Sequence, residues 1–134
     1  MELIKNYLIT LIVFLVIDFI WLGAVARNIY REELGFLLKD SFNMLAAFLF
    51  YFIFTAGILF FVINHALAIS SWQYALFAGM FFGFVTYATY DLTNLSTIND
   101  WPLKITIIDL IWGTFLGGMS SYFSYIIINF ISKK

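Results

Sequence analysis

The chain has 134 residues, of which 63% are hydrophobic and 22% aromatic, and its formal net charge is −1. A soluble domain of this length cannot bury so much apolar surface, so the composition indicates that a lipid bilayer is the solvent. The near-neutral charge excludes the basic field of a nucleic-acid-binding protein. With no cysteine and one histidine, the sequence also excludes thiol redox chemistry and multi-histidine metal centres.

Four apolar stretches, each about long enough to cross the hydrocarbon core as a helix, occupy residues 4–26, 44–66, 73–95 and 103–131. They predict an all-α fold, an integral membrane four-helix bundle that forms a single transmembrane domain over residues 1–134. The short connection at residues 65–72 predicts that spans two and three are antiparallel neighbours.

The connection at residues 27–43 places Ile29, Tyr30 and Leu34 at helical spacing among charged residues. This pattern predicts a short amphipathic interfacial helix on the membrane surface between spans one and two. On the same segment, Arg27 and Arg31 are i,i+4 neighbours, which makes them candidates for contact with a lipid headgroup.

The ends of the later spans carry capping signals. Asp40 or Ser41 is expected to cap the second span, and Ser70 with Gln73 fits a capping box that opens the third. The fourth span opens after Trp101, which is expected at the water interface, as in an aromatic belt.

Three aspartates, Asp18, Asp91 and Asp109, lie within these apolar stretches. An ionisable group in hydrocarbon costs at least about 2.5–3.5 kcal/mol, so it usually faces a partner, a cavity or a ligand. Four antiparallel spans place all three carboxyls in one half of the membrane. No lysine or arginine lies deep enough to neutralise them, so we expect at least one carboxyl to be protonated or cation-bound at neutral pH.

A short internal repeat relates the first and last spans. Ile17-Asp18-Phe19-Ile20-Trp21 matches Ile108-Asp109-Leu110-Ile111-Trp112 at four of five positions. Because the two spans run in opposite directions, Asp18 is expected level with Trp112, and Trp21 level with Asp109. Each carboxylate is then able to face an indole N–H of the other helix.

The helix faces point to a pocket at the acidic end of the bundle. Asp91 and Asn94 share one face of the third span and are the first candidate pair for a ligand. The glycine pairs 79/83 and 113/117 are expected to pack within the bundle, pinching it away from the acids. Further polar residues are expected from the second span: Asn43, Tyr51 and Thr55.

These patterns define the predicted site. Its substrate, proton or cation residues are Asp18, Trp21, Tyr87, Tyr90, Asp91, Asn94, Asp109 and Trp112. Candidate metal ligands are Asp18, Asp91 and Asp109, because carboxylates suit divalent cations. The sequence contains no nucleophile motif, histidine ligand pair or cofactor fingerprint, so catalytic residues and cofactors stay unassigned.

Several strings resemble one known family. They are Ile17-Asp18-Phe19-Ile20-Trp21-Leu22-Gly23, YATYDLTNL at residues 87–95, and Trp101-Pro102-Leu103 followed by Asp109 and Trp112-Gly113. Together they resemble the bacterial membrane-protein family called domain of unknown function 2177, over essentially the whole chain. The resemblance implies a small four-helix protein of the bacterial inner membrane and names no activity.

Three functions are left open. The favoured hypothesis is binding or transport of a proton-coupled cationic or polar solute in an acidic intramembrane pocket. The alternatives are a lipid-modifying enzyme that uses the aspartates for acid–base or metal-assisted chemistry, and a non-catalytic membrane scaffold. Expected partners are membrane lipid and a small polar, cationic or lipid ligand, with a homodimer left open and no nucleic acid.

Overall fold

The computed structural model describes residues 2–37 and 43–133. Four helical stretches in it are long and apolar enough to cross a membrane, namely Glu2–Ala24, Met44–Ile69, Trp72–Thr97 and Leu103–Ser132. The predicted all-α four-helix membrane bundle is therefore confirmed.

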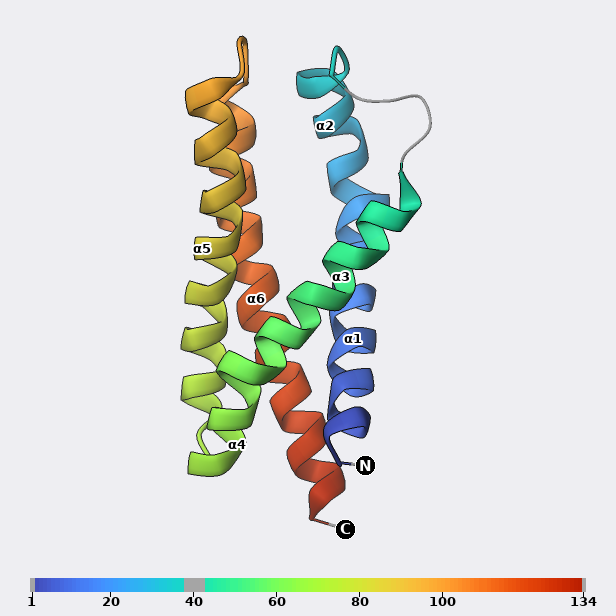
Figure 1. Ribbon diagram of the computed structural model, residues 1–134, viewed down its shortest axis with the longest axis vertical. Helices are drawn as coiled ribbons and strands as arrows, with labels where there is room; N and C mark the ends of the chain where they lie inside the picture. The colour runs from blue at the N-terminus through green and yellow to red at the C-terminus, as the bar shows by residue number, and fades with distance from the viewer. Residues whose placement is uncertain (1, 38–42, 134) are drawn as a thin grey trace.

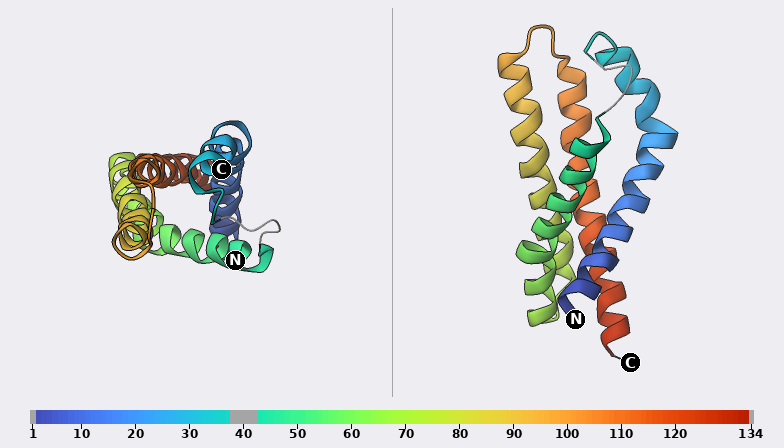
Figure 2. Two further views of the ribbon diagram at one scale, coloured as in Figure 1. Left: turned by 90° about the horizontal axis from the view of Figure 1, so that it is seen from above. Right: turned by 45° about the vertical axis from the view of Figure 1, so that its right-hand side comes forward.

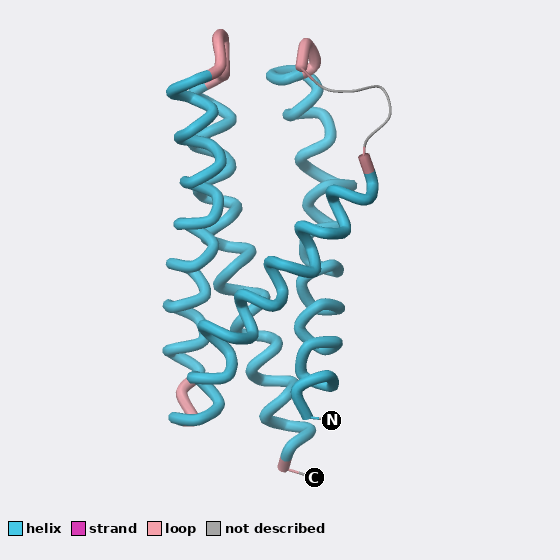
Figure 3. Tube along the Cα trace, in the orientation of Figure 1, coloured by secondary structure: helices cyan, strands magenta, loops and turns pink. Residues whose placement is uncertain are grey.

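The first two spans each contain a π-helical turn, whereas the last two are unbroken α-helices. Span one and its extension comprise α1 (Glu2–Trp21), η1 (Leu22–Ala26) and α2 (Arg27–Leu34). Span two comprises α3 (Met44–Ile58), η2 (Leu59–Ile63) and α4 (Asn64–Ile69). The remaining spans are α5 (Trp72–Thr97) and α6 (Leu103–Ser132), and Figure 3 shows how short the described loops are.

The spans run antiparallel, with both chain ends at one end of the bundle and the α5–α6 turn at the other (Figure 1). Seen from above, the helices form the sides of a square (Figure 2). Helix α3 crosses the bundle diagonally, so span two approaches α5 at the end with the termini and leaves it towards the α5–α6 turn. The bundle is therefore splayed at the end where α2 lies.

Helices α5 and α6 are held together by glycines. A methyl group added at Gly83 would meet the carbonyl oxygen of Gly113, and one added at Gly117 would meet that of Gly79. Backbones can approach this closely only where neither helix carries a side chain. Both glycine pairs therefore pack within the bundle.

An apolar layer fills the middle of the bundle. Phe14 of α1 is fully buried and stacks on Phe54 of α3, with ring centroids 5.0 Å apart. Ile58 and Leu116 are also fully buried in this cluster. Such a packed layer separates the two ends of the bundle interior.

Helix α2 is amphipathic, as predicted, but it continues the direction of α1 and does not turn across the bundle (Figure 1). Its apolar side packs on the start of α6: buried Leu34 and half-buried Ile29 and Tyr30 contact Trp101 and Ile105. This contact gives α2 a partner within the protein, so its apolar face does not depend on the membrane surface for burial.

Two capping predictions differ from the structure. Asp40 and Ser41 lie outside the described residues, and the cap of α3 is Asn43, whose side chain accepts a hydrogen bond from the first turn. The cap of α5 is Ser71, because Ser70 ends the preceding helix in the left-handed conformation with φ 53°. A residue in that conformation cannot also serve as an extended N-cap.

Candidate functional site

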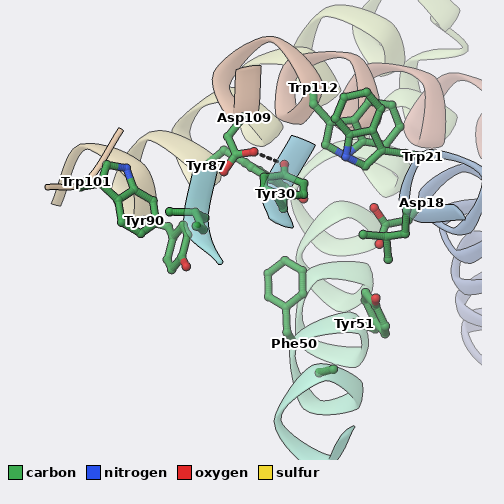
Figure 4. A pocket seen from close by; sticks show the side chains of 13 residues that line it. Asp18, Trp21, Tyr30, Phe50, Tyr51, Tyr87, Tyr90, Trp101, Asp109 and Trp112 are labelled. Atoms are coloured by element: carbon green, nitrogen blue, oxygen red, sulfur yellow. Dashed lines mark hydrogen bonds between the residues drawn. The ribbon is translucent and has the colours of Figure 1, made fainter. Parts of the chain in front are cut away.

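A pocket of about 300 Å³ lies at the splayed end of the bundle, bordered by α1, α2, α3, α5 and α6 (Figure 4). It carries the carboxyl groups of Asp18 and Asp109. Its other walls are largely aromatic, and these side chains are Trp21, Tyr30, Phe50, Tyr51, Tyr87, Tyr90, Trp101 and Trp112. The predicted site residues found in this lining are Asp18, Trp21, Tyr87, Tyr90, Asp109 and Trp112.

Asp109 is held by a tyrosine from α2. The hydroxyl of Tyr30 donates a hydrogen bond to Oδ1 of Asp109, which is 5% exposed (Figure 4). Burial and the neighbouring charge of Asp109 raise the pKa of Tyr30 above its ordinary value. Tyr30 therefore stays protonated at neutral pH and remains a hydrogen-bond donor to the carboxylate.

Asp18 enters the pocket from α1, beside the hydroxyl of Tyr51 and the indole of Trp112. The position beside Trp112 follows the antiparallel register of the internal repeat. The Nε1 atom of Trp112, however, makes no hydrogen bond with any residue that the structure describes. Trp112 instead stacks on Trp21, with ring centroids 4.4 Å apart and an interplanar angle of 9°. The repeated Asp-Trp strings therefore build an indole pair beside a carboxyl.

Trp101 closes the pocket near the α5–α6 turn. It is 8% exposed, and its Nε1 donates to Oγ1 of Thr106 at 3.1 Å. Its ring meets that of Tyr90 edge-on at 6.0 Å. Trp101 does not present its ring on the outside of the bundle, because its indole N–H has a partner inside the fold and its ring packs against α2. Its position at the water interface stays a prediction.

Asp91 and Asn94 do not line the pocket. Asp91 is fully buried, and neither of its carboxyl oxygens has a hydrogen-bond partner among the described residues. Its carboxyl lies close enough to that of Asp109 for the two to interact. Asn94 is half-buried beside Tyr90. On this helix Tyr87 and Tyr90 face the pocket, while Asp91 forms a carboxyl pair with Asp109.

The pocket is acidic without a matching base. Its lining holds two carboxyls and no lysine or arginine among the residues that the structure describes. Arg27 and Arg31 are exposed on α2 and lie outside the lining. Across the described part of the chain, no group of three or more acidic or histidine side chains is placed to hold a metal ion.

Tyr51 was expected from the second span, but three other aromatic residues of the lining were not predicted: Tyr30, Phe50 and Trp101. The small or aliphatic lining residues Leu22, Leu34 and Ala47 were not predicted either. Tyr30 could have been found from the apolar side of the amphipathic segment, which needs a partner. Phe50 directly precedes Tyr51 in an apolar run, and such a run does not indicate which face of the helix points into the bundle. Trp101 precedes the proline at the start of the helix, and a tryptophan at this position is as typical of a membrane-interface residue as of a pocket residue.

Four antiparallel apolar helices around this pocket define a small integral membrane protein with an acidic, aromatic intramembrane site. The chain matches the family described as "Predicted membrane protein (DUF2177)" over residues 3–126 and belongs to that family, as the sequence resemblance implied. No curated protein and no solved structure matches the chain.

Proposed function

We propose that this protein binds an organic cation in the pocket and carries it across the membrane in exchange for protons. The observation that carries the proposal is the lining itself. Two carboxyls, Asp18 and Asp109, stand among eight aromatic side chains, with no basic side chain among the described lining residues.

Aromatic walls and carboxylates together suit an ammonium group. The faces of tryptophan and tyrosine rings attract cations, contributing about 0.5–2 kcal/mol for each favourable contact. Trp21 and Trp112 supply stacked indoles, and Tyr87 and Tyr90 supply phenol rings from α5. An anion would meet two carboxyls here, which disfavours anionic ligands.

The carboxyl pair behind the pocket supports exchange with protons. Asp91 and Asp109 are both at most 5% exposed, and no lysine or arginine lines the pocket beside them in the described part of the chain. Two such carboxyls repel each other when both are charged, and either a proton or a bound cation relieves the repulsion. Cation and proton therefore compete for the same negative charge.

The two other hypotheses have less support. A lipid-modifying enzyme with Arg27 and Arg31 as headgroup contacts needs both arginines near the acids, and they lie outside the pocket lining. A scaffold gives no reason for Asp91 to be buried without a hydrogen-bond donor among the described residues.

The protein is expected to lie in a lipid membrane and to have lipid as a partner. Exposed side chains such as Phe60 at 70%, Phe81 at 68% and Ile111 at 68% suit contact with lipid on several faces. We place the protein in the bacterial inner membrane, in keeping with the family resemblance. A homodimer is an expectation that accompanies this proposal.

Uptake into proteoliposomes tests the proposed exchange. Vesicles with an acidic interior should accumulate labelled tetramethylammonium, whose charge is fixed, and collapse of the pH gradient should abolish the uptake. Asp109→Asn should lose this uptake. The matched control Asp100→Asn should retain it, because Asp100 is exposed and its φ of 62° is one that asparagine tolerates. Uptake equal to that of protein-free vesicles would contradict the proposal.

A further inference from the structure

A second, apolar hollow adjoins the acidic pocket. It has a volume of about 420 Å³ and is lined by Phe50, Thr86, Tyr87 and Tyr90. Three of these residues, Phe50, Tyr87 and Tyr90, also line the acidic pocket. The two hollows are therefore adjacent, one acidic and one apolar, with these three side chains at their junction.

The apolar hollow lies where α3 has separated from α5. Helix α5 packs on α6 through glycines and meets span two through η2 and α4. Towards the α5–α6 turn, α3 runs away from α5 (Figure 1). The side chains at the gap are open, with Phe50 40% exposed and Tyr90 59% exposed. These exposed side chains show that the gap opens to the outside of the bundle, the side on which a membrane-spanning helix meets lipid.

We infer that the ligand is a single-chain amphiphilic cation, whose ammonium head occupies the acidic pocket and whose hydrocarbon chain lies between α3 and α5. This inference rests on the proposed function, because it names the ligand class for the same pocket. The head matches the carboxyls of Asp18 and Asp109, and the chain matches the apolar lining around Thr86. The hydrocarbon chain of such a ligand can enter the gap sideways from the membrane, without passing through water.

The side chains common to both hollows would contact both parts of one bound molecule. Tyr87 and Tyr90 stand at the junction, and each presents an aromatic body with a polar tip. Their rings can contact both the ammonium group and the first methylene groups of the chain. Tyr87 is also fixed from behind, because its ring packs directly on Gly113 of α6.

A blocking substitution in the apolar hollow tests the inference with two cations that share one head. Tetramethylammonium and decyltrimethylammonium binding are measured in lipid nanodiscs for wild type, Thr86→Phe and Thr89→Phe. The control is matched, because both threonines lie on α5 and bond a backbone carbonyl at 2.7 Å, but only Thr86 lines the hollow. Thr86→Phe should weaken the binding of decyltrimethylammonium by about tenfold, because the new ring would compete with the alkyl chain for the same apolar space. The same substitution should change the affinity for tetramethylammonium by no more than about twofold, because this cation has no chain that the new ring could exclude from the hollow.

Other results overturn the inference. If Thr86→Phe leaves both cations unaffected, or weakens both equally, the chain does not lie in this hollow, and the proposed function stands. If the wild type binds neither cation, the proposed function itself fails.

A measurement on the wild type removes any dependence on folding of the variant. A decyltrimethylammonium probe with a photoreactive group at the chain end should label peptides of α3 and α5 around Phe50 and Thr86. Labelling confined to α1 or α6 would overturn the inference.

Discussion

Tyr30 donates a hydrogen bond to Asp109, a residue 79 positions further along the chain. The bond joins α2, which extends the first span, to the beginning of the last span. It gives the Asp109 carboxylate a donor that carries no charge, so the pocket keeps its negative character. The bond also places the aromatic ring of Tyr30 in the pocket wall.

Loss of this donor should cost stability in a pH-dependent way. Tyr30→Phe should lower the unfolding free energy at pH 7 by about 1.5–3 kcal/mol, the usual range for a hydrogen bond to a charged group. Because the pKa of Tyr30 is raised in the folded protein, its contribution is complete below the ordinary value of 10.0 and declines as pH rises above it. Thermal unfolding in detergent from pH 7 to about 11.5 should therefore show the two proteins converging at high pH. A difference that stays constant or widens would contradict this role.

The two neighbouring carboxyls should respond differently to neutralisation. Asp91→Asn should keep or raise the unfolding temperature at pH 8, because it removes a buried charge whose oxygens have no hydrogen-bond donor among the described residues. Asp109→Asn should lower it, because Tyr30 then loses its charged acceptor. Strong destabilisation by Asp91→Asn would show that its carboxylate is bonded and structural.

The glycine contact between α5 and α6 should not tolerate a methyl group. Gly83→Ala would press against the carbonyl of Gly113 and should cost about 1–3 kcal/mol. The control is Gly23→Ala in η1, where nothing lies within 4 Å of the added carbon and where alanine should gain about 0.5–1 kcal/mol. Thermal unfolding of both variants provides the comparison. Equal stability would mean that α5 and α6 can separate without loss.

The stacked indoles should contribute to cation binding. Trp21→Leu removes one ring of the Trp21–Trp112 pair and should weaken tetramethylammonium binding by about tenfold, the upper part of the range for a cation–π contact. Trp72→Leu is the matched control, because Trp72 lies at the start of α5, at the opposite end of the bundle. Titration calorimetry in nanodiscs compares the two. An equal loss in both variants would indicate a general effect on folding.

The spans could be predicted from the sequence because the bilayer imposes a length and a composition on each of them. All four predicted ranges overlap the observed helices within a few residues at most ends. Helix ends were less predictable, as Ser70 and Ser71 show, because adjacent serines differ only in backbone conformation. The direction of α2 could not be predicted, since it depends on packing against Trp101 and Ile105.

The site was predictable where helix register alone decides it. The position of Asp18 beside Trp112 follows from the rise per residue in two antiparallel helices. The position of Tyr30 could not be predicted from helix register alone. The π-helical turn η1 changes which face of the following helix meets the bundle. Asp91 illustrates the remaining limit: it shares a helix face with Tyr87 at i+4, yet only the longer tyrosine reaches the pocket.

A pocket that exchanges a cation for protons must hold the cation in competition with them. The most direct measurement is the affinity of the purified protein for tetramethylammonium as a function of pH, for wild type and for the double variant Asp18→Asn/Asp109→Asn. Wild-type binding should tighten with rising pH, by up to about tenfold per unit for one displaced proton, and the double variant should bind weakly at every pH. Wild-type binding that does not change with pH, or binding that survives the loss of both carboxyls, would show that the pocket does not exchange a cation for protons.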